Sequence, residues 1–249
     1  MNIDDKYLLS DIKVSKKKQD EFFSIIKDRA NGKPVSRIIR KRNFWNSEFY
    51  INGSTLDPRP DSEILLESIL TAFPDKAANL KFIDFGTGTG CLLLSALNEF
   101  PNSSGVGVDI SKECIKLARE NAALNGLSRR ALFIESDWGR AVTDKFDIII
   151  ANPPYIQSDA ISSLDPEVKN FDPHIALNGG QDGLSCYRKL APQFVEVLKK
   201  RGLVFLEIGY NQRESVSNIM EGSGLKCLQI NQDLGNRDRC LVLGHRHQY

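Results

Sequence analysis

The sequence contains little cysteine and no long apolar run. Its five cysteines, in 249 residues, include no C-x-x-C pair, which argues against a disulfide framework or a zinc site and for reduced thiols. No apolar stretch approaches the ~18 residues of a membrane helix, and the first residues, Met1 to Lys6, lack the basic and apolar regions of a signal peptide. We therefore expect a cytoplasmic protein with no membrane partner and no metal.

A large excess of charge of one sign is also absent. The net charge is +1, but residues 1–60 carry 13 Lys and Arg against 8 Asp and Glu (net +5), which leaves 20 against 24 (net −4) for residues 61–249. The basic end could contact an acidic partner such as RNA or a protein face, or could be an ordinary solvated helix surface. The sequence pI of 7.6 lies below the value above ~9 of dedicated nucleic-acid binders, so we expect no stable nucleic-acid binding.

The N-terminal part predicts one helix and one β-hairpin. Residues 15–30 carry an apolar stripe and end at Asn31-Gly32, which indicates a helix. Residues 37–51 alternate and contain several aromatic side chains, so we interpret them as a β-hairpin with its turn at Asn46-Ser47.

The rest of the chain predicts an α/β domain. The expected strands are 81–85, 104–109, 131–136, 146–151 and 202–208, and the expected helices are 64–72, 90–99, 111–125, 184–200 and 211–222. Short apolar strands joined by helical crossovers form a parallel sheet covered on both faces. Two last strands, 225–231 and 238–243, are joined too closely for a crossover and should form an antiparallel edge hairpin. The prediction is a mostly parallel seven-stranded sheet.

The first strand of this domain ends in a glycine-rich turn, Asp84-Phe-Gly-Thr-Gly-Thr-Gly90. Glycines allow a tight turn and a close approach of the backbone to a ligand. A dinucleotide fingerprint G-x-G-x-x-G would need glycine where Cys91 stands, and no G-K-[ST] is present to form a P-loop. The turn therefore predicts a cofactor without phosphates, with a glycine turn that binds nothing as the alternative.

Acidic and aromatic residues stand at the ends of the next two strands. Asp109 follows Gly90 by 19 residues, the separation at which an acid holds ribose hydroxyls in such folds. An Asp in this place is more often a helix N-cap, although Ser111 could provide that cap. Asp137 and Trp138 could flank an adenine ring, and a Trp that closes the edge of the core is an equally good interpretation.

The fourth strand runs directly into Asn152-Pro153-Pro154-Tyr155. The prolines cannot donate ladder hydrogen bonds, so they end the strand as a rigid corner. Ligands of open α/β sheets bind outside the carboxyl ends of the strands. The four strand ends should therefore meet at one crevice.

With these features the chain resembles the Rossmann-like class I methyltransferases that use S-adenosyl-L-methionine (adenosylmethionine). The segment Asn152-Pro153-Pro154-Tyr155, here called the tip, resembles that of the subgroup that methylates planar nitrogen. The resemblance implies that the Asn152 side-chain oxygen and the Pro153 carbonyl accept the two N–H bonds of the substrate nitrogen. It also implies that Tyr155 lies against the flat substrate group. The implied catalytic residues are Asn152, Pro153, Pro154 and Tyr155, and the implied cofactor-binding residues are Gly86, Thr87, Gly88, Thr89, Gly90, Asp109, Asp137, Trp138 and Asn152.

Three further stretches resemble the glutamine methyltransferases that act on peptide-chain release factors. Residues 56–63, LDPRPDSE, resemble L-I-P-R-P-[ED]-T-E, with Asp57 and Ser62 in place of Ile and Thr. Residues 176–188, ALNGGQDGLSCYR, and 233–239, DLGNRDR, resemble two other segments of that family. The resemblance implies methyl transfer from adenosylmethionine to the side-chain amide nitrogen of the glutamine in a release factor's Gly-Gly-Gln motif.

We expect a monomer with two parts. Residues 1–55 would be a helical segment and linking β-hairpin that dock the release factor, and residues 56–249 would be the methyltransferase domain. Family members usually open with a longer helical domain, so only its second half would be present. One alternative is a methyltransferase for an exocyclic amine of adenine or guanine in DNA or RNA, against which the net negative charge of residues 61–249 counts. Another is a non-catalytic binding protein with the same fold.

Overall fold

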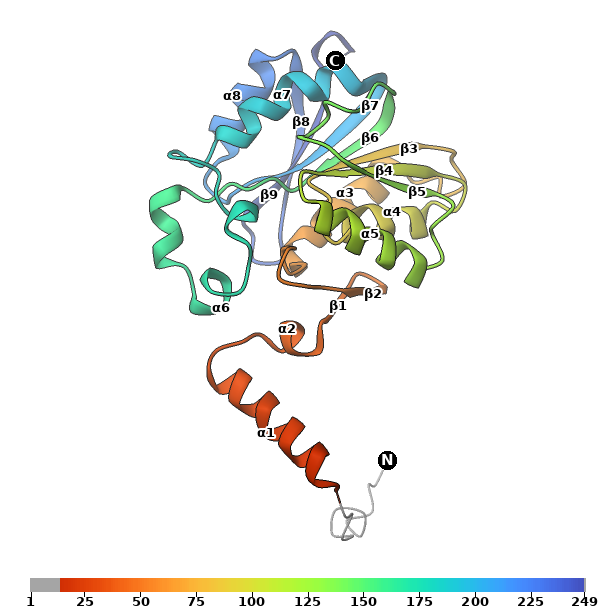
Figure 1. Cartoon of the computed structure of the whole chain (residues 1–249). Helices are drawn as coiled ribbons and strands as arrows, with labels where there is room; N and C mark the ends of the chain where they lie inside the picture. The colour runs from red at the N-terminus through yellow and green to blue at the C-terminus, as the bar shows by residue number, and fades with distance from the viewer. Residues whose placement is uncertain (1–13, 249) are drawn as a thin grey trace.

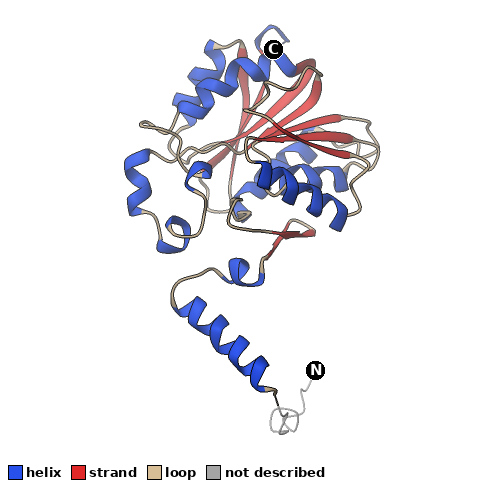
Figure 2. Cartoon of the chain, viewed as in Figure 1, coloured by secondary structure: helices blue, strands red, loops and turns tan. Residues whose placement is uncertain are grey.

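A seven-stranded sheet in the order β5-β4-β3-β6-β7-β9-β8 forms the centre of the molecule in the computed structural model, which describes residues 14–248 (Figures 1 and 2). The strands are β3 (Lys81–Phe85), β4 (Ser104–Asp109), β5 (Ala131–Glu135), β6 (Phe146–Ala151), β7 (Leu198–Glu207), β8 (Leu225–Gln232) and β9 (Asp238–His245). Strands β3 to β7 pair in parallel, whereas β9 is antiparallel to both β7 and β8. The predicted sheet and its antiparallel hairpin are confirmed.

Helices cover both faces of this sheet because successive strand residues point to opposite sides. The helices are α3 (Glu63–Ala72), α4 (Cys91–Glu99), α5 (Lys112–Leu124), α7 (Ser185–Val197) and α8 (Arg213–Gly222). Helices α3, α4 and α5 pack against Phe82 and Ile148, and α7 and α8 pack on the other face against Ile83 and Ile149 (Figure 1). One boundary prediction is wrong: the helix predicted over 184–200 ends at Val197, and β7 begins at Leu198.

The N-terminal part contains α1 (Lys16–Ala30), α2 (Val35–Ile39) and a hairpin of β1 (Lys41–Phe44) and β2 (Ser47–Tyr50). The helix prediction is confirmed over the described residues, and residues 1–13 of the predicted docking part lie outside them. The prediction of an extended segment from residue 37 is wrong, because Arg37 is buried within α2 and donates to the backbone carbonyl of Thr55. The turn lies at Trp45-Asn46, one residue earlier than predicted.

Trp45 explains this shift of the turn. It has a backbone φ of 53°, which residues other than glycine adopt at a cost in free energy. Its backbone N–H donates to Glu63 Oε1 (2.8 Å), and its indole donates to Glu99 Oε1 (2.8 Å). These two contacts tie the hairpin to α3 and α4 and hold the residue in place.

The connection between β6 and α7 folds beside the carboxyl ends of the strands. It contains η3 (Ser158–Ser163), α6 (Pro166–Lys169) and η4 (His174–Ala176), while η2 (Pro60–Ser62) precedes α3 and η5 (Arg246–Gln248) follows β9. Within residues 14–248 no helix combines the length and the apolar character needed to cross a membrane. All five cysteines are free, and two of them, Cys114 and Cys240, are buried.

Candidate active site

A cavity of about 330 Å³ opens at the carboxyl ends of β3, β4, β5 and β6. The chain leaves β3 toward β4 and β5 on one side and returns with β6 on the other, so the switch point of the sheet lies between β3 and β6. Predicted site residues that line the cavity are Gly86, Thr87, Gly88, Thr89, Asp109, Asp137, Trp138, Asn152 and Pro154. The predicted convergence of four strand ends on one crevice is confirmed.

The glycine-rich turn forms the floor of this cavity. Gly86, Gly88 and Gly90 all have positive φ, at 73°, 53° and 81°. The Gly86 and Thr87 N–H groups both donate to the Val108 carbonyl at 2.9 Å, which fixes the turn against β4. Gly90 does not line the cavity, because the space beside it is filled by Leu94 and Phe133. A Cβ there would lie 3.2 Å and 3.3 Å from these side chains, so Gly90 permits close packing of α4.

Asp109 lies at the edge of the turn with its carboxylate fixed by two backbone groups. Oδ2 accepts from the Gly88 N–H and Oδ1 from the Ser111 N–H, each at 2.9 Å. Ser111 caps α5 by accepting from the Cys114 N–H, as the sequence allowed. Asp109 is thereby free to present its remaining lone pairs to the cavity. Burial raises the pKa of this carboxyl, and the backbone donors oppose that shift.

Trp138 stands over the glycine-rich turn, and Asp137 lies beside it. A Cβ at Gly86 would lie 3.5 Å from Cζ3 of Trp138, so the indole and the turn enclose one end of the cavity. Asp137 pairs with Arg140 at 3.1 Å. Trp138 both packs against the core and lines the cavity, so its role as a flank of an adenine ring stays a prediction.

The Asn-Pro-Pro-Tyr tip divides between the cavity and the core. Asn152 and Pro154 line the cavity, whereas Pro153 is buried and Tyr155 lies behind it, outside the lining. Asn152 Nδ2 donates to Ser62 Oγ at 3.0 Å, and the Tyr155 hydroxyl donates to Glu207 Oε1 at 3.2 Å. Within the described part of the chain no group donates to Asn152 Oδ1, so this acceptor is available.

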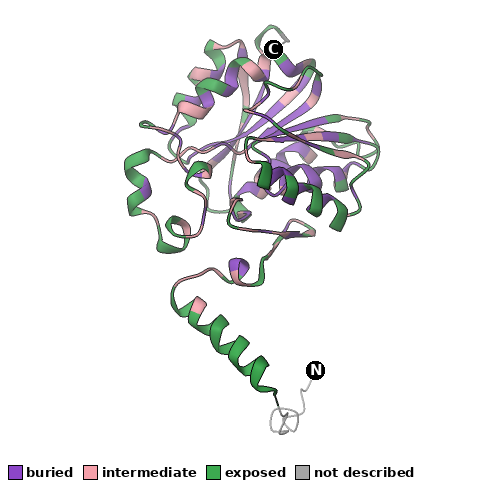
Figure 3. Ribbon diagram, in the orientation of Figure 1, coloured by how far each residue is buried: buried purple, intermediate pink, exposed green. Residues whose placement is uncertain are grey.

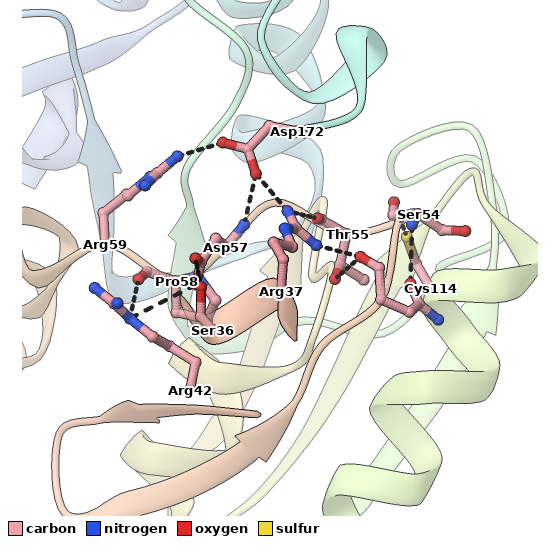
Figure 4. Close-up of polar contacts among 11 residues, drawn as sticks. Ser36, Arg37, Arg42, Ser54, Thr55, Asp57, Pro58, Arg59, Cys114 and Asp172 are labelled. Atoms are coloured by element: carbon pink, nitrogen blue, oxygen red, sulfur yellow. Dashed lines mark hydrogen bonds and ion pairs between the residues drawn. The ribbon is translucent and has the colours of Figure 1, made fainter. Parts of the chain in front are cut away.

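A cluster of charged side chains surrounds Asp172, which lies just before η4 (Figure 4). Asp172 accepts from Arg37, from Arg59 and, at 3.2 Å, from the Asp57 N–H. Arg59 also lines the cavity. The cluster joins the connection between β6 and α7 to the segment that follows the hairpin.

Three polar residues at the site were not predicted. Ser62 and Glu207 contact the tip directly, and Asp84 lies buried under the glycine-rich turn, where the Thr87 hydroxyl donates to it at 2.6 Å. Burial raises the pKa of Asp84 to about 7. Glu207 could have been found as the one carboxylate at the end of the apolar run Leu203 to Ile208, the same signal that pointed to Asp109.

Comparisons with known proteins agree with this fold. A family model described as a methyltransferase domain matches residues 76–240. A 16S rRNA N2 methyltransferase from T. thermophilus, solved in complex with AdoMet and guanosine, superposes with a TM-score of 0.57. It covers 83% of this chain and 49% of its own length at 18% identity, so this likeness concerns the fold alone. Fold, site and family model together define a Rossmann-like class I methyltransferase.

Sequence relatives narrow the class. The chain is 42% identical over 222 residues to the release factor glutamine methyltransferase of Agrobacterium fabrum, covering 88% of this chain and 77% of that protein. It is 42% identical over 217 residues to the enzyme of the same name from Caulobacter vibrioides, covering 87% and 74%. The chain belongs to the release factor glutamine methyltransferase family.

Proposed function

We propose that this chain transfers a methyl group from adenosylmethionine to the side-chain amide nitrogen of the glutamine in the Gly-Gly-Gln motif of peptide-chain release factors. The observation that carries the proposal is Asn152, whose side-chain oxygen is an unused acceptor on the wall of the glycine-floored cavity. Membership of the family, whose named relatives are glutamine methyltransferases, supports the substrate.

The residues of the cavity fit adenosylmethionine. The volume of the cavity, about 330 Å³, lies within the range of small-molecule sites. Asp109 offers a carboxylate suited to ribose hydroxyls, and Trp138 offers a flat apolar surface suited to adenine. The glycine-rich turn leaves room for close backbone approach and provides no phosphate cradle. When bound there, the cofactor supplies an electrophilic methyl group.

The chain's own contribution is to position a weak nucleophile. An amide nitrogen shares its lone pair with the carbonyl, so it is a weak nucleophile. No ordinary side-chain base is strong enough to deprotonate it first. Asn152 Oδ1 and the Pro153 carbonyl would accept its two hydrogens and hold the nitrogen in line with the methyl group. The nitrogen would form a bond to the methyl carbon as the sulfur–methyl bond of the cofactor breaks, and one of its hydrogens would leave as a proton to solvent water.

Methylation of an exocyclic base amine is the competing function, because the structural neighbour named above is an rRNA methyltransferase. Labelled adenosylmethionine incubated with purified release factor and, separately, with total RNA distinguishes the two. We expect label in the release factor, on the glutamine of its Gly-Gly-Gln motif. Label in RNA alone would refute the proposal.

Replacing Asn152 tests the role of the tip. Asn152→Ala removes the acceptor but leaves the glycine-rich turn and Asp109 in place. We expect kcat to fall by about 10²-fold or more, the usual cost of losing one preorganised polar group, while calorimetry still shows binding of adenosylmethionine. The exposed Asn218→Ala on α8 is the matched control and should keep full activity. Undiminished transfer by Asn152→Ala would exclude the acceptor role.

Several finer features remain predictions. They are the division into residues 1–55 for docking and 56–249 for catalysis, a monomeric state, a cytoplasmic location and the lack of stable nucleic-acid binding.

A further inference from the structure

The tip has an orientation problem that its sequence alone does not solve. An asparagine carboxamide carries an acceptor oxygen and a donor NH2 group of nearly the same shape. Rotation of the Asn152 carboxamide by half a turn would present N–H donors to a substrate that also brings N–H donors. The proposed function requires the oxygen to face the cavity, so some other group must fix the carboxamide.

Two buried side chains provide that constraint. Asn152 Nδ2 donates to Ser62 Oγ (3.0 Å), and Ser62 Oγ donates to Glu207 Oε2 (2.6 Å). Ser62 and Glu207 are only 3% and 2% exposed, so water does not compete for these bonds. Above its pKa of about 7 the Glu207 carboxyl is ionised, and an ionised carboxylate can only accept. The single Ser62 hydrogen is therefore committed to Glu207, and Ser62 can offer Asn152 nothing but a lone pair.

The Glu207 carboxylate lies within a larger group of charged and polar side chains. Its second oxygen accepts from Tyr155 (3.2 Å), whose hydroxyl in turn accepts from Arg239 Nη1 on β9 at 3.4 Å. Arg239 pairs with Asp233 at 3.0 Å and lies 3.6 Å from Asp61 in η2. One carboxylate thus anchors both ends of the tip, Asn152 through Ser62 and Tyr155 directly.

We propose that Glu207 and Ser62 form a positioning relay that fixes the Asn152 carboxamide with its oxygen toward the substrate nitrogen. The role of this relay in methyl transfer rests on the proposed function, whereas its hydrogen bonds are given by the structure alone. Neither Ser62 nor Glu207 touches the reacting atoms in this assignment. Their effect is to exclude the rotated, substrate-repelling form of Asn152.

Ser62 offers a sharp test because one substitution removes its hydroxyl and another keeps it. Ser62→Ala removes the acceptor for Asn152 Nδ2, and Ser62→Thr keeps it.

At about pH 8, where the Glu207 carboxylate is ionised, we expect Ser62→Ala to lose about tenfold in kcat, as for one lost hydrogen bond. The KM for the release factor and the affinity for adenosylmethionine should stay within about twofold, since neither is bound through Ser62. Ser62→Thr should restore kcat. Equal losses in both variants, or an unchanged kcat in Ser62→Ala, would refute the relay.

A second measurement decides the question without methyl transfer. The side-chain NH2 resonances of Asn152 are identified by their loss in the spectrum of Asn152→Ala. In the wild type and Ser62→Thr one of these protons should exchange slowly with water, and in Ser62→Ala both should exchange fast. Fast exchange in the wild type would overturn the relay. Failure of the wild type to methylate any release factor, with the slow proton present, would instead refute the proposed function and leave the relay standing.

Discussion

Glu207 ends β7 with a carboxyl that is almost fully removed from water. Burial is the main cause that raises its pKa to about 7 from an ordinary value of 4.5, against the opposing effects of Ser62, Arg239 and Tyr155. A raised acid pKa means that the folded protein binds this proton more tightly than the unfolded chain does. The contribution of Glu207 to stability is therefore fully present below pH 4.5 and is lost as the pH rises to about 7.

This titration can be measured with Glu207→Gln. We expect the unfolding free energy of the wild type minus that of the variant to fall by about 2 to 3 kcal/mol between pH 4.5 and 7.5, at 1.36 kcal/mol per pKa unit. Urea unfolding at several pH values gives this difference. The exposed Glu196→Gln on α7 is the matched control for the same chemical change outside the buried site. A flat difference for Glu207→Gln would mean that its carboxyl titrates normally in the folded protein.

The sequence predicted the position, at the cavity, of those candidate residues that stand at the end of a strand. The glycine-rich turn, Asp109 and Asn152 each follow an apolar strand directly, so the sheet brings them together. Ser62 and Glu207 are 145 residues apart and meet only through packing of η2 against β7. No local spacing reports such a contact. The resemblance named Ser62 as a departure from threonine, but its hydroxyl role became visible only with its partners.

At the scale of elements, Asp172 fastens the connection between β6 and α7 to the N-terminal segment (Figure 4). Its carboxylate is 2% exposed and pairs with Arg37, which is 5% exposed, and with Arg59. Arg37 and Asp172 are 135 residues apart in sequence. This contact also explains why residues 37–39 lie in the helix α2 and not in the predicted hairpin of residues 37–51, since the helical turn directs Arg37 inward.

Asp172→Ala would leave the Arg37 guanidinium buried without its counter-charge. We expect a loss of about 3 to 5 kcal/mol in unfolding free energy, the usual cost of breaking a buried ion pair from one side. Chemical denaturation measures it directly. Asp159→Ala, at an exposed position in η3, is the matched control and should change stability by less than about 0.5 kcal/mol. A similar small change for Asp172→Ala would show that solvent reaches Arg37.

At the scale of the whole molecule, α1 extends away from the sheet domain with no buried residue (Figures 1 and 3). Its apolar side chains include Phe22, 57% exposed, and Phe23, 65% exposed. Arg29 pairs with Glu167 of α6 at 2.6 Å, which places the end of α1 beside the connection near the cavity. Exposed aromatic side chains gathered on one helix are typical of an interaction surface, and docking of the release factor by this part stays a prediction.

Replacing both Phe22 and Phe23 by Ser tests this surface. We expect the unfolding free energy to change by less than about 0.5 kcal/mol, because neither side chain is buried. The KM for an intact release factor should rise by about tenfold, the scale of losing aromatic anchors. The kinetics with a short Gly-Gly-Gln peptide should not change. Lys17→Ser with Glu21→Ser, which keeps the net charge, is the control on the same helix. An unchanged KM would place docking elsewhere.

The position of β9 has a consequence for biosynthesis. Among the strands it is the last to leave the ribosome, yet it lies inside the sheet between β7 and β8 and brings Arg239 to Tyr155. A nascent chain that has emerged only as far as β8 therefore lacks an interior strand and one support of the tip. Premature termination of translation within the codons for β9 would thus leave β7 and β8 without the strand that joins them and Tyr155 without Arg239.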